Sequence, residues 1–198
     1  MFVLLVFIAA APTASAQDVL ATTEIEPAAA EPSPPPDRGP GAHLRFGLGA
    51  DLAALGATDF FGLGVGVQAR LGVQLSPWFA VYYQPHAIGG LVLTGDSSAG
   101  ALGALFNSAN VELDLPILQV GAGPSVDVLA LAGCSLGTAT CNVDNGTYFG
   151  VDVRAALLIG PHGPGTHSGF AIEANLHPTF LDTDVLTTFT LGFAGEIY

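Results

Sequence analysis

The sequence predicts an all-β chain whose eight antiparallel strands close into an up-and-down transmembrane β-barrel. First, residues 61–75 alternate apolar side chains with glycine, glutamine and arginine, and a period of two is typical of a β-strand. Second, 50% of the residues are apolar, but after the N-terminus no stretch stays apolar for the roughly 18 residues of a membrane helix. Third, seven more segments alternate in the same way, and an even set of strands can close without leaving an edge in lipid.

The N-terminal 42 residues are predicted to lie outside the barrel. Residues 1–16 form an apolar run that ends in Ala14-Ser15-Ala16, the pattern of a secretory signal peptide. Residues 17–42 are rich in proline, alanine and glutamate and should form a disordered linker. The linker is either a spacer or a docking peptide for a periplasmic partner. Residues 43–198 remain as a single barrel domain.

The first half of this domain contains four alternating segments. The first places Arg45 and Asp51 on one face and leucine, phenylalanine and alanine on the other. The second carries four glycines on the face opposite its large apolar side chains. Because these glycines alternate within a strand, they fit a crowded lumen better than a phosphate-binding loop. The third follows the tight Ser76-Pro77 turn, and the fourth follows a predicted loop at 94–100. The predicted strands are 44–52, 61–75, 78–93 and 105–114.

The second half continues the alternation. The polar face carries Gln119 and Asp127 in the fifth segment and Arg154 in the sixth. It carries Glu173 in the seventh and Glu196 in the eighth, opposite phenylalanine, leucine and isoleucine. The predicted strands are 118–128, 149–159, 170–180 and 188–197.

The predicted connections differ in length and one of them holds both cysteines. Tight turns follow the second and fourth strands and longer loops follow the third and fifth, as expected for short periplasmic and long external connections. The connection at 161–169 is longer than this rule predicts. The longest predicted loop, 131–147, contains Cys134 and Cys141. In an exported protein this close pair predicts a disulfide. A metal site would need further ligands besides these two cysteines, so we expect no metal site.

One face of the eight strands gathers the polar side chains, including three of the four arginines. Charges inside a narrow barrel must be paired or solvated, so we expect arginines to bridge acids from neighbouring strands. The interior of an eight-stranded barrel is just wide enough to be filled by side chains, which predicts a plugged lumen. The residues predicted to face inward are Arg45, Asp51, Gln68, Arg70, Gln74, Gln84, His86, Asn110, Glu112, Gln119, Asp127, Asp152, Arg154, Glu173, Asn175, His177 and Glu196.

These residues leave several functions open. The predicted function is a non-enzymatic barrel with a structural, surface-interaction or envelope-integrity role, without a cofactor. A small pore would prefer cations, because inward acids outnumber arginines. A membrane-embedded lipid-modifying enzyme would pair His86 or His177 with Glu112 or Glu173 beside a lipid-facing serine, but no Gly-x-Ser-x-Gly sequence is present. A soluble secreted binding barrel would need the opposite polarity, apolar inside and polar outside.

The net charge of the chain restricts its possible binding partners. The formal net charge is −13 and the chain has no lysine, which argues against nucleic-acid binding. Asp144, Asp182 and Asp184 fall in predicted outer loops. Divalent cations could bridge them to lipopolysaccharide phosphates, or they are solvated loop charges.

The signal peptide, the eight alternating segments, the Ser76-Pro77 turn and the terminal segment 187–198 together resemble the OmpA-type eight-stranded outer-membrane β-barrel proteins of Gram-negative bacteria. The resemblance covers residues 43–198. It implies a monomer in outer-membrane lipid and lipopolysaccharide, with the linker in the periplasm. It also implies insertion by the outer-membrane assembly machinery, which reads a C-terminal strand that ends in an aromatic residue. Tyr198 matches this position, although its phase differs from that of Phe189 and Ile197.

Overall fold

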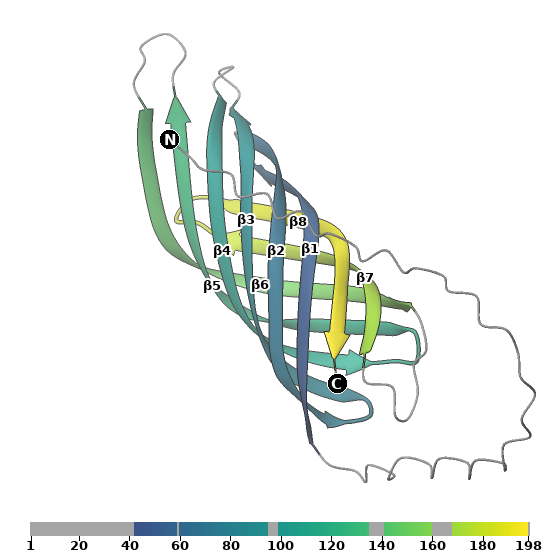
Figure 1. Ribbon diagram of the computed structural model, residues 1–198. Helices are drawn as coiled ribbons and strands as arrows, with labels where there is room; N and C mark the ends of the chain where they lie inside the picture. Colours follow the sequence, from purple (N-terminus) through teal and green to yellow (C-terminus); the bar gives the residue numbers. More distant parts are fainter. Residues whose placement is uncertain (1–41, 59, 95–98, 135–140, 160–167, 198) are drawn as a thin grey trace, which may run out of the picture. The chain divides into compact units, whose positions relative to one another are not determined.

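The computed structural model describes residues 42–58, 60–94, 99–134, 141–159 and 168–197, and within these ranges the chain forms eight β-strands (Figure 1). The predicted fold class is confirmed, because every strand pairs antiparallel with the next and β8 pairs back with β1 in a closed barrel. The strands are β1 (His43–Ala57), β2 (Phe60–Ser76), β3 (Phe79–Thr94), β4 (Ala99–Asp114), β5 (Leu118–Cys134), β6 (Cys141–Ile159), β7 (Ser168–Phe180) and β8 (Val185–Ile197).

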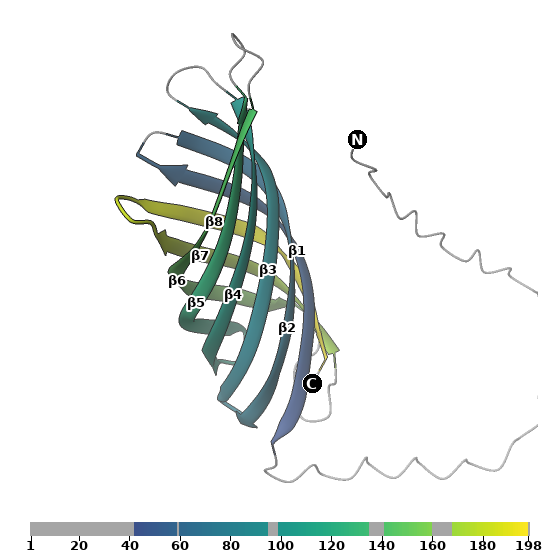
Figure 2. The same ribbon diagram turned by 90° about the vertical axis from the view of Figure 1, so that its left-hand side faces the viewer.

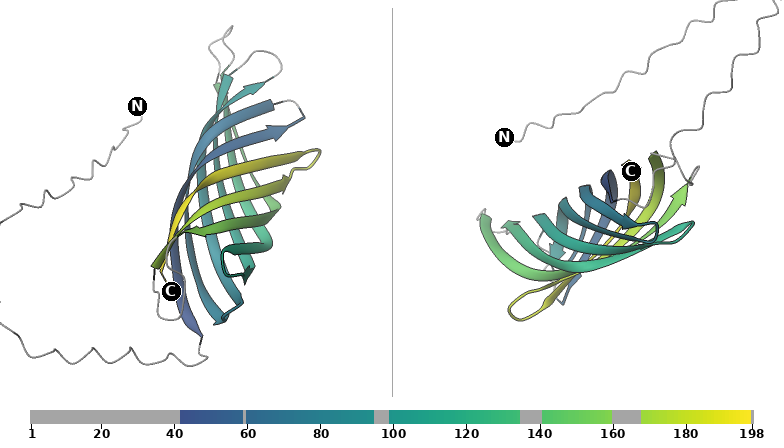
Figure 3. Two further views of the ribbon diagram at one scale, coloured as in Figure 1. Left: turned by 90° about the vertical axis from the view of Figure 1, so that its right-hand side faces the viewer. Right: turned by 90° about the horizontal axis from the view of Figure 1, so that it is seen from below.

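Closure of the barrel brings the first and last strands side by side. Phe46 lies opposite Ile197, and the antiparallel register continues to Gly56 opposite Thr187. Figures 2 and 3 show β8 running along β1. We call the end of the barrel that holds His43 and Ile197 the terminal end, and the opposite end the distal end.

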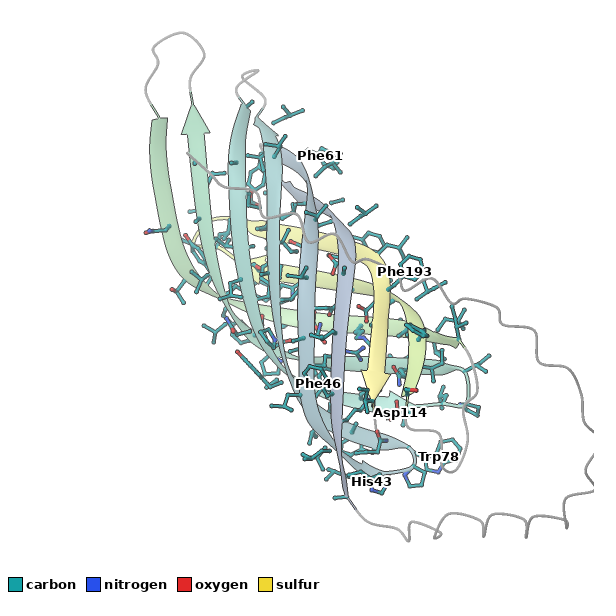
Figure 4. The ribbon with its side chains drawn as sticks, viewed as in Figure 1. His43, Phe46, Phe61, Trp78, Asp114 and Phe193 are labelled. Carbon is teal, nitrogen blue, oxygen red and sulfur yellow. The ribbon has the colours of Figure 1, made fainter. Side chains whose placement is uncertain are left out.

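The outer surface of the barrel is apolar. Along each strand the outward positions include large hydrophobic side chains, and among them Leu63 is 60% and Phe193 68% exposed. Figure 4 shows Phe61 and Phe193 pointing away from the strands. Such an outward apolar surface is typical of a barrel solvated by lipid. It is the reverse of the surface that a soluble secreted barrel would present. No helix long and apolar enough to span a membrane occurs in the described part of the chain.

Several strands are longer at the distal end than the sequence predicts. The predicted first strand stops at residue 52, whereas β1 continues to Ala57. The predicted loop at 94–100 is wrong at its end, because β4 already begins at Ala99. The predicted loop at 131–147 is also wrong over most of its length, because β5 runs to Cys134 and β6 starts at Cys141. At this end the inward side chains are apolar or small, so the contrast between the two faces disappears from the sequence.

The turns at the terminal end agree with the expected short connections. Pro77 and Trp78 join β2 to β3, next to a register shift between Gln74 and Ser76. Residues 115–117 join β4 to β5, closed by the Leu115 N–H donating to the Leu118 carbonyl at 2.8 Å. The distal end also has short connections, at residues 58–59 and 181–184. Short turns are therefore not confined to one end.

Some predictions concern residues outside the described ranges. These are the signal peptide and nearly all of the linker, the connection at 161–169 up to residue 167, and Tyr198. The backbones of Cys134 and Cys141 are opposite each other in the β5–β6 ladder. Their side chains lie outside the described part of the structure, and the disulfide stays a prediction.

Candidate functional site: the barrel lumen

The structure places every residue that was predicted to face inward in the lumen, where each is buried. Their side chains form two layers along the barrel axis, and an apolar layer follows at the distal end. We call them the ion-pair layer (Arg45, Arg70, Arg154, Glu112, Glu173 and Glu196), the histidine layer (Asp51, His86, Ser125, Asp127, Asp152 and His177) and the apolar layer (Ala53, Leu55, Ile88, Val92, Leu102, Ala104, Phe106, Leu129 and Leu186).

Arg154 of β6 is the centre of the ion-pair layer. Its side chain is fully buried, and its guanidinium contacts carboxylates from three other strands. Nη1 pairs with Glu112 of β4, Nη2 lies 3.2 Å from Glu196 Oε1 of β8, and Nε donates to Glu173 Oε2 of β7 at 3.1 Å. Three charge-assisted bonds from one planar group link strands on opposite sides of the barrel. The layer therefore crosses the lumen.

Arg45 and Arg70 complete this layer from β1 and β2. Arg45 lies 2.7 Å from Glu112 Oε1, 2.6 Å from Glu196 Oε2 and 3.1 Å from Asp114 Oδ2. Arg70 pairs with Glu196 and lies 3.4 Å from Glu173 Oε2. The three carboxylates of the layer are thus shared between the three arginines, as expected for charges held away from water.

Two glutamines extend the ion-pair layer toward the histidine layer. Gln84 Nε2 donates to Gln68 Oε1 at 2.6 Å, and Gln68 Nε2 donates in turn to Glu173 Oε1. Both side chains are buried. Gln68 Nε2 also lies 3.4 Å from Asp51 Oδ2, so polar contacts continue along the lumen from one layer to the next.

His177 of β7 lies between two carboxylates in the histidine layer. Nδ1 is 3.2 Å from Asp152 Oδ1, and Nε2 is 3.0 Å from Asp127 Oδ2 and 3.1 Å from Ser125 Oγ. Thr179 donates to the same Asp127 oxygen at 2.7 Å. Three residues of β5 and β6 thus contact the imidazole, and Thr179 holds the Asp127 carboxylate in place.

His86 of β3 forms a second pair in this layer. Its Nε2 lies 3.0 Å from Asp51 Oδ2 of β1. Phe106 lies between the two histidines, stacked on His177 at 4.1 Å and edge-on to His86 at 6.0 Å. The ring of Phe106 therefore joins the histidine layer to the apolar layer.

Ser125, His177 and Asp152 come into contact in the order of a serine-hydrolase triad. The lipid-modifying hypothesis requires such a group at the lipid-facing rim. Here all three side chains are inside the lumen, and at most 3% of each residue is exposed. The Ser125 hydroxyl is therefore not lipid-facing. The described residues also contain no group of three or more metal-binding side chains that could hold an ion.

The apolar layer is the part of the lumen that the sequence does not predict. Its residues occupy the inward positions near the distal ends of the strands, and Leu55, Val92 and Phe106 are each only 1% exposed. The rule that polar side chains face inward excludes them. The sequence does contain a second signal. In each strand these apolar residues lie an even number of positions from the inward polar residues, so extending the period of two would have placed them in the lumen.

The loop acids have different surroundings. Asp184 ties the β7–β8 turn to the β1–β2 turn, because the Thr58 N–H donates to its Oδ2 at 3.0 Å and the Val185 N–H to its Oδ1 at 2.7 Å. The backbone N–H of Thr58 is the main group that holds the pKa of Asp184 below its usual range. Asp182 is exposed, and the side chain of Asp144 lies outside the described part of the structure.

Lumen glycines make room for the charged layers, and Gly150 of β6 is the clearest case. A Cβ at this position would meet the Asp127 carboxylate and the His177 ring, whose Nε2 would be 2.9 Å away. We expect Gly150→Val to lower the free energy of unfolding by about 1–3 kcal/mol through overpacking. The matched variant is Gly89→Val, because Gly89 faces outward with nothing within 4 Å of its Cβ. Urea titration in lipid would measure both, and equal losses would contradict this account of Gly150.

No protein-family model matches the sequence, and no curated protein matches it. Among solved structures it is similar to Neisserial surface protein A (NspA), with a TM-score of 0.52, 11% identity and coverage of 79% of this chain and 98% of that chain. It is also similar to Ail, the attachment invasion locus protein of Yersinia pestis, in complex with the heparin analogue sucrose octasulfate, with a TM-score of 0.53, 13% identity and coverage of 79% and 99%.

The chain has the fold of these outer-membrane β-barrels. At this identity the likeness concerns the path of the backbone and does not extend to the side chains inside the lumen. The barrel fold explains why the sequence signal lies in alternation, because a membrane barrel needs only that its outward positions be apolar.

Proposed function

We propose that the chain is a non-enzymatic outer-membrane β-barrel with a structural, surface-interaction or envelope-integrity role, and that its own side chains close its lumen. The observation that carries the proposal is the ion-pair layer. Arg154 is fully buried and contacts acids from three strands across the lumen. A water-filled path would leave such a group solvated.

The apolar layer gives the closure a second barrier. Its nine residues come from β1, β3, β4, β5 and β8, and Phe60, Leu131, Tyr148 and Leu181 pack against them. Ions would have to cross this layer without hydration. A small cation-preferring pore is the second candidate, since the buried residues include six acids and only three arginines.

A surface-interaction role fits the projecting hairpins at the distal end. The β5–β6 ladder continues from Val126 opposite Phe149 to Cys134 opposite Cys141, whereas β7 pairs with β6 only as far as Phe149. The β5–β6 hairpin therefore extends beyond its β7–β8 neighbour (Figure 1). The two similar structures are of a surface protein and of an attachment invasion locus protein.

The location that we propose is the bacterial outer membrane, with the N-terminal linker in the periplasm. The apolar outward surface and the barrel fold support this location. The assembly machinery would read the last strand and Tyr198, lipid and lipopolysaccharide would surround the apolar belt, and the barrel would be a monomer.

Two measurements test the proposal. Fractionation of the producing bacterium should place the protein in the outer membrane, where a folded barrel migrates differently in a gel before and after boiling. Reconstituted in planar bilayers, the barrel should give no discrete current steps. Cation-selective current steps would contradict the closed lumen and favour the pore hypothesis. A protein that is soluble without detergent would contradict both the closed membrane barrel and the membrane pore.

A further inference from the structure

A pocket lies at the distal end of the lumen, above the apolar layer. It has a volume of about 160 Å³. Its apolar lining comes from five strands or turns, with Phe60 of β2, Leu102 of β4, Leu129 and Leu131 of β5, Leu181 of the β7–β8 turn and Leu186 of β8. We propose that this pocket binds a small, neutral, apolar molecule of the size of a single aromatic ring.

The pocket exists because of two local features of β6. Beyond Phe149 this strand has no β7 partner among the described residues, so the wall of the barrel is lower on that side. In addition, the Tyr148 ring lies across Gly146, where a Cβ would be 2.6 Å from Cε2 of that ring. Both residues line the pocket. A glycine here keeps the tyrosine against the strand and leaves the space above the leucines open.

Size and lining define the ligand. An engineered protein cavity of about 150 Å³ lined by leucine, isoleucine and phenylalanine stays dry and binds benzene. The present pocket has nearly the same volume, and leucine and phenylalanine form most of its lining. It differs in being open on one side, where Asn145 lines it, so the ligand would enter from that side without a rearrangement of the barrel. A larger ligand would have to displace Leu102, Leu129 or Leu186, which also belong to the tightly packed apolar layer. Those three leucines form the floor of the pocket, so the ligand would be held at the outer mouth and not passed on.

Charge narrows the ligand to neutral molecules. Asp182 and Asp184 lie in the same β7–β8 turn as Leu181, and the chain carries a net charge of −13. An anionic analogue would meet this charge without a basic partner in the pocket lining. Toluene and benzoate have the same ring size but differ in charge, so comparing them separates the effect of ligand charge from that of ligand size.

The test uses the full-length barrel in lipid nanodiscs with labelled leucine methyl groups. Toluene should give intermolecular NOEs to Leu129 and Leu131 that saturate with concentration. Lipid-facing Leu63, which is 60% exposed, reports simple partition into the bilayer. Benzoate at the same concentrations should give no NOE to the pocket leucines. NOEs that rise only at Leu63, without saturation at Leu129, would overturn the proposal.

Two matched variants locate the site. Leu131→Trp fills the pocket and should weaken toluene binding, measured at Leu129, at least tenfold. Ala130→Trp adds the same ring on the outward face of β5 and should leave binding unchanged. If Leu131→Trp fails to fold, Gly146→Val, which pushes the Tyr148 ring into the pocket, provides the same test. Undiminished binding in a folded pocket-filling variant would overturn the assignment. The result does not depend on whether the lumen below conducts.

Discussion

Replacing Arg154 with methionine should lower the free energy of unfolding by about 3–5 kcal/mol, the usual cost of removing one partner of a buried ion pair. Methionine has a similar length but no charge, so Glu112, Glu173 and Glu196 would share only Arg45 and Arg70. Buried carboxylates cannot recover this loss by solvation. Urea titration of the barrel in lipid vesicles, followed by the gel shift between folded and unfolded forms, would measure the change.

Two further variants separate charge from packing in this experiment. Val153→Met places the same side chain on the outward face of β6, where Val153 is exposed, and should change stability little. Glu112→Gln added to Arg154→Met removes one of the stranded charges and should restore part of the loss. Losses that simply add in the double variant would show that Arg154 and Glu112 are not coupled, and the ion-pair layer would lose its central role.

The polar lumen was predictable because one physical rule fixes it. Lipid requires apolar outward positions, so in a strand the alternate positions must hold every charge. Arg45, Arg154 and Glu196 could therefore be placed inside from the period of two alone. The same rule could not say which arginine meets which acid. Arg45 contacts Glu112, Asp114 and Glu196, far apart in sequence, and these contacts depend on strand tilt and closure.

The distal end of the barrel was not predictable from the same rule. There Leu55, Val92 and Phe106 face inward while leucines and alanines face lipid, so both faces are apolar and alternation carries no signal. Parts of the strands at this end were consequently predicted as loops, most clearly at 131–147. The pocket above this layer depends on the unequal lengths of neighbouring hairpins, a property that appears only when the strands are paired.

Phe106 should be the second most sensitive position, because it connects the histidine and apolar layers. Its ring stacks on His177 with centroids 4.1 Å apart and is 1% exposed. Phe106→Ala would leave a cavity between two packed layers and should cost about 3–5 kcal/mol of unfolding free energy. The same urea titration in lipid vesicles would measure it.

The matched variant for Phe106 is Phe149→Ala on the outward face of β6. Phe149 is 55% exposed and stacks on Phe180 at 6.0 Å. Lipid chains can occupy the space that its ring leaves, so no cavity forms and the loss should be clearly smaller than for Phe106→Ala. The difference between the two variants isolates the cost of a cavity inside the lumen. Equal losses would mean that the apolar layer is loosely packed, and the second barrier to ion passage would then have no physical basis.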